Sequence, residues 1–129
     1  PGPLTIIAPA GDSLQWDLGE SGGCVALRVP SHSVLLELMQ EAGPLAATQA
    51  SKAGKAVGSV DQIGEIFGNE VSCFLVDPGL QASKPSTVVD ACDQESSPVL
   101  RVRRRGPITL TELRRVVGKD AVKDATRRG

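Results

Sequence analysis

The chain has 129 residues, of which 40% are hydrophobic, so it is long and apolar enough to bury the core of one domain. Two Phe, one Trp and no Tyr mean that this core must be aliphatic. No apolar run approaches the ~20 residues of a membrane span and no signal peptide is visible, so a membrane is not an expected partner.

The formal net charge of −1 conceals an asymmetry between the two parts of the chain. Residues 1–100 hold 4 basic and 12 acidic side chains, whereas residues 101–129 hold 10 basic and 3 acidic ones. Only the C-terminal part therefore has an electrostatic preference for polyanions such as tRNA or double-stranded RNA.

The cysteines and the single histidine limit the chemistry. Cys24, Cys73 and Cys92 are odd in number and have no C-x-x-C spacing, which argues against a disulfide framework or a zinc site. A reducing compartment, the cytoplasm, is the expectation. His32 precedes a predicted helix, so we expect it to cap or pack rather than to act as a base or metal ligand.

In chain order, the pattern predicts strands that alternate with helices. Apolar runs bounded by Pro, Gly or polar residues predict six strands, at 4–8, 24–29, 44–48, 71–77, 86–91 and 98–104. Apolar positions at helical spacing predict three helices, at 34–42, 61–68 and 110–118. The fold class is therefore α/β, a twisted mixed sheet with flanking helices.

Polar start signals precede the predicted helices. Ser31 or Ser33 could cap the first helix, and Thr109 could cap the last. Residues 1–118 are expected to form the domain, and the basic, polar residues 119–129 a disordered tail.

Two groups of arginines could bind anions. Arg28 closes the apolar strand "CVALR", where its guanidinium could fork onto a carboxylate or phosphate, or pair with a surface acid. In "RVRRRG" (101–106), alternation places Arg101, Arg103 and Arg105 on one strand face and Arg104 on the other. This stripe could bind the phosphates of a nucleotide or RNA, or could simply be a charged edge strand.

The segment "SKAGKAVGS" (51–59) looks superficially like a phosphate-binding loop. A P-loop needs G-x-x-x-x-G-K-[ST], but here Lys55 is followed by Ala56 and no glycine lies five residues before Gly54. A solvated turn is the better interpretation.

Five segments in series resemble one family, the YrdC-type threonylcarbamoyl-AMP synthases. They are "PGPLT", "VALRVPSH" before an amphipathic helix, "GPLAAT", "STVVD", and "VLR" followed by "GPIT". The resemblance extends to Gly118. It implies a twisted α/β fold that condenses ATP, L-threonine and bicarbonate into threonylcarbamoyl-AMP and pyrophosphate. A threonylcarbamoyl transferase would then modify tRNA. ATP would be a substrate, with Mg²⁺, and no tightly bound cofactor is expected.

The resemblance also implies site residues, none of them catalytic in the strict sense. Threonine-binding positions correspond to Arg28, Gln49 and Ser86. ATP-binding positions correspond to Cys24, Ser51, Ser59, and either Arg101 or Arg104.

The departures from the family fall at these ligand positions. Cys24 stands where the family usually has threonine, and the family's S-A-N turn is Gln49-Ala50-Ser51 here. Replacing an amide by a hydroxyl removes a group that donates and accepts at once.

The family's N-terminal segment, with its lysine–arginine motif, has no counterpart before Pro1. The domain is therefore expected to be partial and incomplete for catalysis. The alternatives are a non-catalytic relative that binds nucleotide or RNA, and a decayed remnant.

Overall fold

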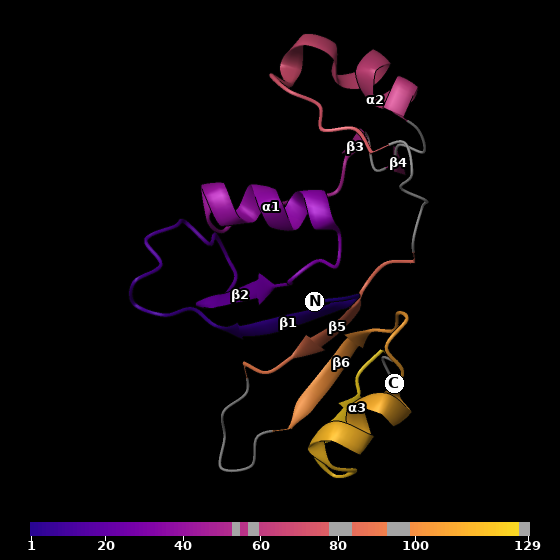
Figure 1. The fold of residues 1–129 in the computed structure, drawn as a ribbon. Coiled ribbons are helices and arrows are strands. Elements are labelled where there is room, and N and C mark those ends of the chain that lie inside the picture. The colour runs from indigo at the N-terminus through magenta and orange to yellow at the C-terminus, as the bar shows by residue number, and fades with distance from the viewer. Residues whose placement is uncertain (53–54, 57–59, 78–83, 93–98, 127–129) are drawn as a thin grey trace.

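A computed structural model describes residues 1–52, 55–56, 60–77, 84–92 and 99–126 (Figure 1). Its main element is a five-stranded sheet in the order β2-β1-β5-β6-β7. The strands are β1 (Leu4–Pro9), β2 (Cys24–Leu27), β5 (Thr87–Asp90), β6 (Leu100–Arg104) and β7 (Val122–Asp124). β1 pairs with β5, and β6 with β7, in parallel, while β2 and β6 run antiparallel to β1 and β5. The predicted mixed sheet is confirmed.

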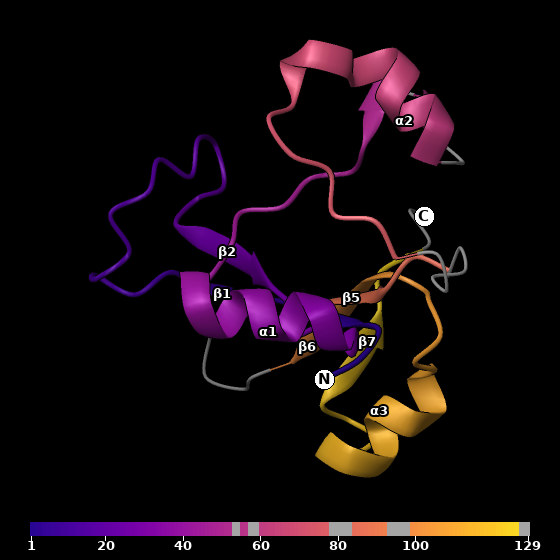
Figure 2. The ribbon, with the colours of Figure 1, turned by 45° about the horizontal axis from the view of Figure 1, so that its top comes forward.

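The helices lie at different distances from this sheet. They are α1 (Ser33–Ala42), α2 (Val60–Phe67), followed by a 3-10 turn at Gly68–Glu70, and α3 (Leu110–Val117). In Figures 1 and 2, α3 lies beside β6 and β7, α1 lies near β1 and β2, and α2 stands apart. A separate two-stranded sheet joins β3 (Ser51–Lys52) to β4 (Lys55–Ala56). None of the helices in the described part of the chain could cross a membrane.

The core lies between the sheet and α3. Its buried side chains come from β5, β6, α3 and β7, namely Val89, Val102, Leu113 and Val122. Helix α3 begins with a capping box in which the Thr109 hydroxyl accepts the Glu112 N–H and the Glu112 carboxylate accepts the Thr109 N–H. The predicted cap at Thr109 is confirmed.

Helix α1 is capped differently from the prediction. Its N-cap is His32, whose Nδ1 accepts the Leu35 N–H at 3.3 Å, so neither Ser31 nor Ser33 has this role. The other ring nitrogen, Nε2, lies 2.7 Å from Asp77 Oδ2. This confirms the expected capping role of His32 and ties the start of α1 to the segment after α2.

Three sequence predictions about secondary structure are wrong. Residues 44–48 and 71–77 are not strands, because neither run finds a strand partner among the described residues to satisfy its N–H and C=O groups. The predicted disordered tail at 119–129 contains β7, and Val122 is only 2% exposed. Parallel pairing with β6 orders residues Val122–Asp124. So short and polar a segment gives no sign of this pairing in the sequence.

The expectation of no disulfide is also wrong. Cys24 and Cys92 form one, with their Cα atoms 6.5 Å apart, while Cys73 is free and exposed. Cys24 begins β2 and Cys92 follows β5, and both strands pair with β1. The fold therefore brings together two cysteines that lie 68 positions apart in the sequence.

Gly106 permits a close backbone approach between the end of β6 and the start of β5. A Cβ atom at this position would lie 2.4 Å from Thr87 N and 2.5 Å from Pro85 O. The same region is held by the Thr87 hydroxyl, which donates to Ile108 O at 2.7 Å, and by the Thr87 N–H, which donates to Pro3 O at 2.9 Å.

We expect Gly106→Ala to lower the free energy of unfolding by about 1–3 kcal/mol or more, because the methyl group would meet backbone that cannot move aside cheaply. The matched control is Gly64→Ala in α2, where a Cβ would meet open space and alanine is the better helix former. Urea denaturation measures both. Equal effects of the two substitutions would contradict this account.

Reduction of the Cys24–Cys92 disulfide should destabilise the chain. The bond closes a loop across a sequence separation of 68. In the chain-entropy description a loop of this size contributes about 4 kcal/mol. Thermal melts with and without a reductant, compared with the Cys24→Ser/Cys92→Ser variant, test this. A reductant effect that persists in the double variant would contradict it.

Candidate ligand-binding face

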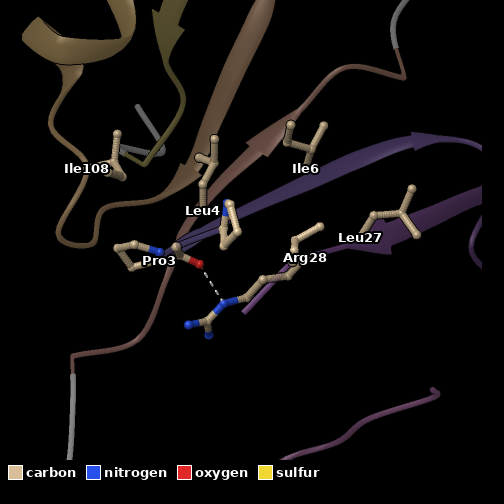
Figure 3. Close-up of a pocket in the computed structure, with 9 residues that line it drawn as sticks. Pro3, Leu4, Ile6, Leu27, Arg28 and Ile108 are labelled. Carbon is tan, nitrogen blue, oxygen red and sulfur yellow. Dashed lines mark hydrogen bonds between the residues drawn. The ribbon is translucent and has the colours of Figure 1, made fainter. Parts of the chain in front are cut away.

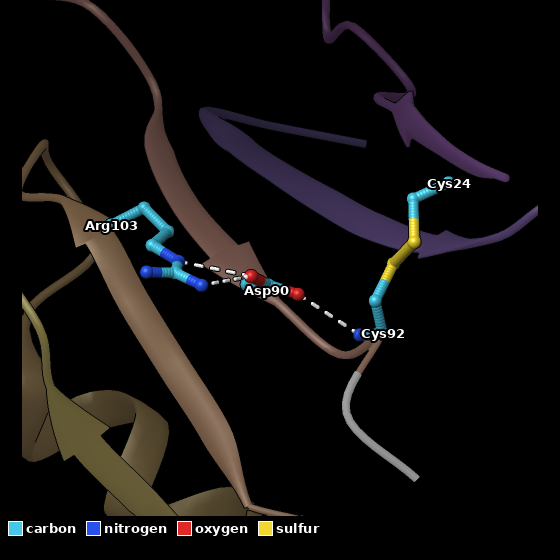
Figure 4. The surroundings of a disulfide bond; sticks show 4 residues. All are labelled: Cys24, Asp90, Cys92 and Arg103. Carbon is cyan, nitrogen blue, oxygen red and sulfur yellow. Dashed lines mark hydrogen bonds and ion pairs between the residues drawn. A yellow bond between two sulfur atoms is a disulfide. The ribbon is translucent and has the colours of Figure 1, made fainter. Parts of the chain in front are cut away.

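The strand register places several predicted site residues on one face of the sheet, which we call the polar face. Cys24 pairs with Pro9, Ile7 with Asp90, and Asp90 with Arg101. Opposite residues in a ladder share a face, and so do residues two apart on one strand. Cys24, Asp90 and Arg101 therefore lie at one end of this face, which we call the Cys24 end. Figure 4 shows Cys24 and Asp90 there.

The other end of the polar face gathers around Ser86, which is only 4% exposed. Its Oγ lies 2.7 Å from the Thr5 hydroxyl. Arg104 donates from Nε to Ser86 O at 2.9 Å and from Nη2 to Ser86 Oγ at 3.0 Å. The structure thus joins Ser86 and Arg104, two of the predicted site residues, directly.

Arg28 follows the last residue of β2 and belongs to this same Ser86 end of the sheet. Its Nε donates to Gly2 O at 3.0 Å. Figure 3 shows it beside Pro3, Leu4 and Leu27, where it lines a pocket of about 510 Å³. Its two terminal nitrogens donate no hydrogen bond to the described part of the chain.

The two ends are separated by the length of four strand residues. Ser86 and Asp90 are four apart along one strand, as are Cys24 and Arg28 along another. At ~3.3 Å per residue this is about 13 Å. The polar face therefore suits an elongated ligand with a different polar group at each end.

A register shift in the sheet corrects the predicted alternation of the arginines. It falls between Val88 and Val89, opposite β6. As a result Arg103 donates a hydrogen bond to Asp90, while Arg104 donates one to Ser86. Ser86 and Asp90 lie four residues apart in the sequence. Arg103 and Arg104 therefore do not point to opposite faces, because a bulge inserts an extra residue.

Electrostatics on this face are largely satisfied within the chain. The Cys92 backbone N–H donates to Asp90 at 2.9 Å, and together with Arg103, at 2.7 and 2.9 Å, it lowers the pKa of Asp90. On the opposite face, where Asp124 pairs with Val102, the Thr126 hydroxyl and then Arg105 lower the pKa of Asp124. Arg103 and Arg105 are therefore held by acids of this chain, which weakens the case for an RNA-binding stripe.

The remaining predicted residues lie elsewhere. Gln49 is exposed in the segment before β3, and Ser51 belongs to β3, outside the five-stranded sheet. Ser59 lies outside the described residues.

Sequence reasoning missed Thr5 and Asp90. One sequence signal could have identified Asp90. It is an acidic residue at the end of an apolar strand, in a chain that also has an arginine-rich strand. The described residues contain no cluster of three or more metal-ligating side chains.

Comparison with known proteins identifies the family. The Sua5/YciO/YrdC family model, described under the heading of telomere recombination, matches residues 1–106. The chain therefore belongs to the Sua5/YciO/YrdC family, and the resemblance seen in its sequence segments is confirmed.

Its relatives are named as threonylcarbamoyl-AMP synthases. A protein of Mycobacterium leprae assigned this activity is 36% identical over 124 residues, which cover 92% of this chain and 52% of that protein. The synthase of Pyrococcus abyssi is 31% identical over 121 residues, covering 92% and 34% of the two chains. The chain thus spans about half the length of the mycobacterial relatives it matches.

Solved structures agree with the observed fold. The crystal structure of P. abyssi Sua5 complexed with L-threonine is similar with a TM-score of 0.76 and 27% identity. The match covers 95% of this chain and 36% of that one. The expected YrdC-like α/β fold is confirmed.

Asp90 generates a prediction about pH. Because its pKa in the folded chain is lowered, its contribution to stability is present above the unfolded pKa of ~3.9 and is lost as the pH falls through the folded value. We expect Asp90→Asn to cost about 1–3 kcal/mol at pH 7. The difference from wild type should shrink below about pH 4.

Urea denaturation of both proteins at pH 7, 5, 4 and 3 measures this difference. Asp12→Asn, in an exposed loop, is the control. A gap between wild type and Asp90→Asn that is constant across this range would contradict the assignment.

Proposed function

We propose that this chain forms part of the substrate-binding sheet of a threonylcarbamoyl-AMP synthase. The single observation that carries the proposal is the polar face. Within a chain of this family, it separates a Ser86–Arg28 end from a Cys24–Arg101 end by about 13 Å. The reaction joins L-threonine, bicarbonate and ATP into one elongated adenylate with release of water and pyrophosphate, so it needs two such ends.

The Ser86 end would hold threonine. The terminal nitrogens of Arg28 could form the paired hydrogen bonds that a carboxylate accepts, while its Nε stays anchored on Gly2 O. Ser86 and Thr5 would supply hydroxyls at the same end of the sheet, where Arg104 donates to the Ser86 hydroxyl. A solved relative is described as a complex with L-threonine, which supports this choice of ligand.

The Cys24 end would hold ATP. Of the two arginines that could match the family's ATP-contacting residue, we favour Arg101, because its register pairs it with Asp90 at the end where Cys24 lies. Arg104 is committed to Ser86. Ser51 and Ser59 would approach ATP from the turn region, and Gln49 would approach threonine.

Mg²⁺ would enter on the phosphates of ATP, since it commonly binds through substrate phosphates and keeps several waters instead of requiring an all-protein cage. The residues of the chain would act by positioning the reactants and by stabilising the charge that develops on phosphate during transfer. The expected charged group for this is the guanidinium of Arg101.

The setting follows from the same reaction. A transferase would pass the threonylcarbamoyl group to tRNA, in the cytoplasm. Cys24 would lie at the ATP end joined to Cys92 by the disulfide, and it would be a free thiol there only after that bond is reduced. The arginine pairs described above give no observation in favour of an RNA-binding role.

Calorimetric titration of L-threonine into the reduced chain tests the proposal. Loss of a charge-assisted pair costs ~1.5–3 kcal/mol, so Arg28→Ala should weaken threonine binding roughly 10- to 100-fold. Ser86→Ala should weaken it less. Arg115→Ala, on exposed α3, is the control. Equal affinity for Arg28→Ala and wild type would overturn the threonine assignment.

The same protein should not release pyrophosphate in a manner dependent on threonine and bicarbonate, because the chain spans only part of its relatives.

A further inference from the structure

The Cys24–Cys92 disulfide lies at the Cys24 end of the polar face (Figure 4). Cys24 begins β2 and Cys92 follows β5, and β1 lies between these two strands in the sheet. The bond therefore crosses over the end of β1, where Pro9 pairs with Cys24. Both cysteines are partly exposed, so a small thiol can reach the bond from solvent.

Contacts other than the sulfur bond set the positions of both cysteines. The ladder with β1 holds Cys24. Cys92 is held through Asp90, which accepts the Cys92 N–H on Oδ1 at 2.9 Å and two hydrogen bonds from Arg103 on Oδ2, at 2.7 and 2.9 Å. These contacts keep the two Cα atoms 6.5 Å apart, so after reduction the thiols would stay close enough for the bond to form again.

Reduction changes what the Cys24 end can offer to a ligand. In the disulfide, the Cys24 sulfur has no proton to donate, and the Cys92 side chain is fixed against it. As a thiol, Cys24 can donate a hydrogen bond, and the Cys92 side chain can rotate about its Cα–Cβ bond. The Cys24 end is therefore more polar and less crowded when reduced. The Ser86 end lies about 13 Å away and holds neither cysteine.

We propose that Cys24 and Cys92 form a thiol–disulfide switch that controls nucleotide binding at the Cys24 end. The reduced chain binds ATP more tightly, and the disulfide weakens this binding by removing a donor and by crowding the site. The switch rests on the proposed function, because it takes ATP as the ligand of this end.

The switch reacts with a small thiol such as glutathione. One thiolate attacks a sulfur of the Cys24–Cys92 bond, which forms a mixed disulfide and releases the other cysteine as a thiolate that takes up a proton. A second thiolate attacks the small-thiol sulfur of the mixed disulfide, which releases the remaining cysteine and the disulfide of the small thiol. In total the chain gains two electrons and two protons, and two small thiols lose them.

The test is calorimetric titration of ATP into the oxidised chain and into the chain reduced with a phosphine. Wild type should bind ATP at least about tenfold more tightly when reduced. The Cys24→Ser/Cys92→Ser variant cannot form the bond, so its ATP affinity should be the same with and without the reductant. Cys73→Ser, a change at the free and exposed cysteine, is the matched control and should respond to reduction like wild type.

Thermodynamic linkage gives a second measurement on the same protein. If reduction raises the affinity for ATP, then ATP must favour the thiol form by the same factor. The chain is equilibrated in glutathione buffers of different ratios, with and without ATP, and its free thiols are counted by alkylation and mass spectrometry. Saturating ATP should shift the midpoint of reduction toward the thiols by at least about tenfold in the ratio of squared glutathione to glutathione disulfide.

Equal ATP affinity of the oxidised and reduced chains would overturn the switch alone and leave the bond as a structural cross-link. So would a response to reductant that persists in the Cys24→Ser/Cys92→Ser variant, or circular dichroism that shows the reduced chain to be unfolded. ATP binding by neither folded form would overturn the assignment of ATP to the Cys24 end, and the switch with it.

L-Threonine binding to both forms shows whether the effect is local. Its affinity should change less than twofold on reduction, because threonine is assigned to the Ser86 end, about 13 Å away. A change in threonine affinity as large as the change in ATP affinity would overturn the switch, because the disulfide would then act on the whole sheet.

Discussion

The parallel pairing of β1 with β5 is the constraint on which the rest of this structure depends. It aligns Leu4 with Thr87 and Ile7 with Asp90, across more than eighty residues of sequence. β2 then pairs with the free side of β1 and β6 with the free side of β5. The Thr5–Ser86 contact and the Cys24–Cys92 disulfide both follow from this one alignment. Loss of the β1–β5 pairing would therefore disrupt both ends of the polar face at once.

Arginines of β6 stabilise the polar face by hydrogen bonds to its other residues. Arg103 and Arg104 are neighbours in sequence, yet they reach Asp90 and Ser86, the two ends of the β5 segment. Only the bulge opposite Val88 and Val89 makes this possible. These two arginines of the basic strand therefore hold groups of this chain in place. Composition suggested RNA because it counts the arginines and does not show their partners within the chain.

Local signals in the sequence predicted the local structure well. All three helices begin and end within one or two residues of the predicted positions, because apolar spacing and caps are local properties. Four predicted strands are present for the same reason. The runs at 44–48 and 71–77 failed because an apolar run shows a tendency to be buried, while a strand also needs a partner. The short strand at Val122–Asp124 shows the reverse case, in which a partner orders a polar segment.

The candidate site could be predicted only in part. Arg28, Ser86 and Cys24 were identified because a family pattern marks their positions, and residue type alone left the role of Arg28 open. Thr5 and Asp90 could not be found in this way, since their roles come from strand register. The disulfide has the same origin. A spacing of 68 residues carries no signal until the sheet places both cysteines around the end of β1.

The two faces of the sheet differ in how completely this chain satisfies them. On the polar face, Asp90, Ser86 and Arg104 find partners within the chain. On the apolar face, α3 covers Val89 and Val102, whereas Ile6 remains 42% exposed. Helix α1 contributes no fully buried residue. A domain of about 130 residues normally buries roughly two thirds of its surface. Because the core among the described residues is so small, the Cys24–Cys92 cross-link should matter more for stability here than in a domain with a complete core.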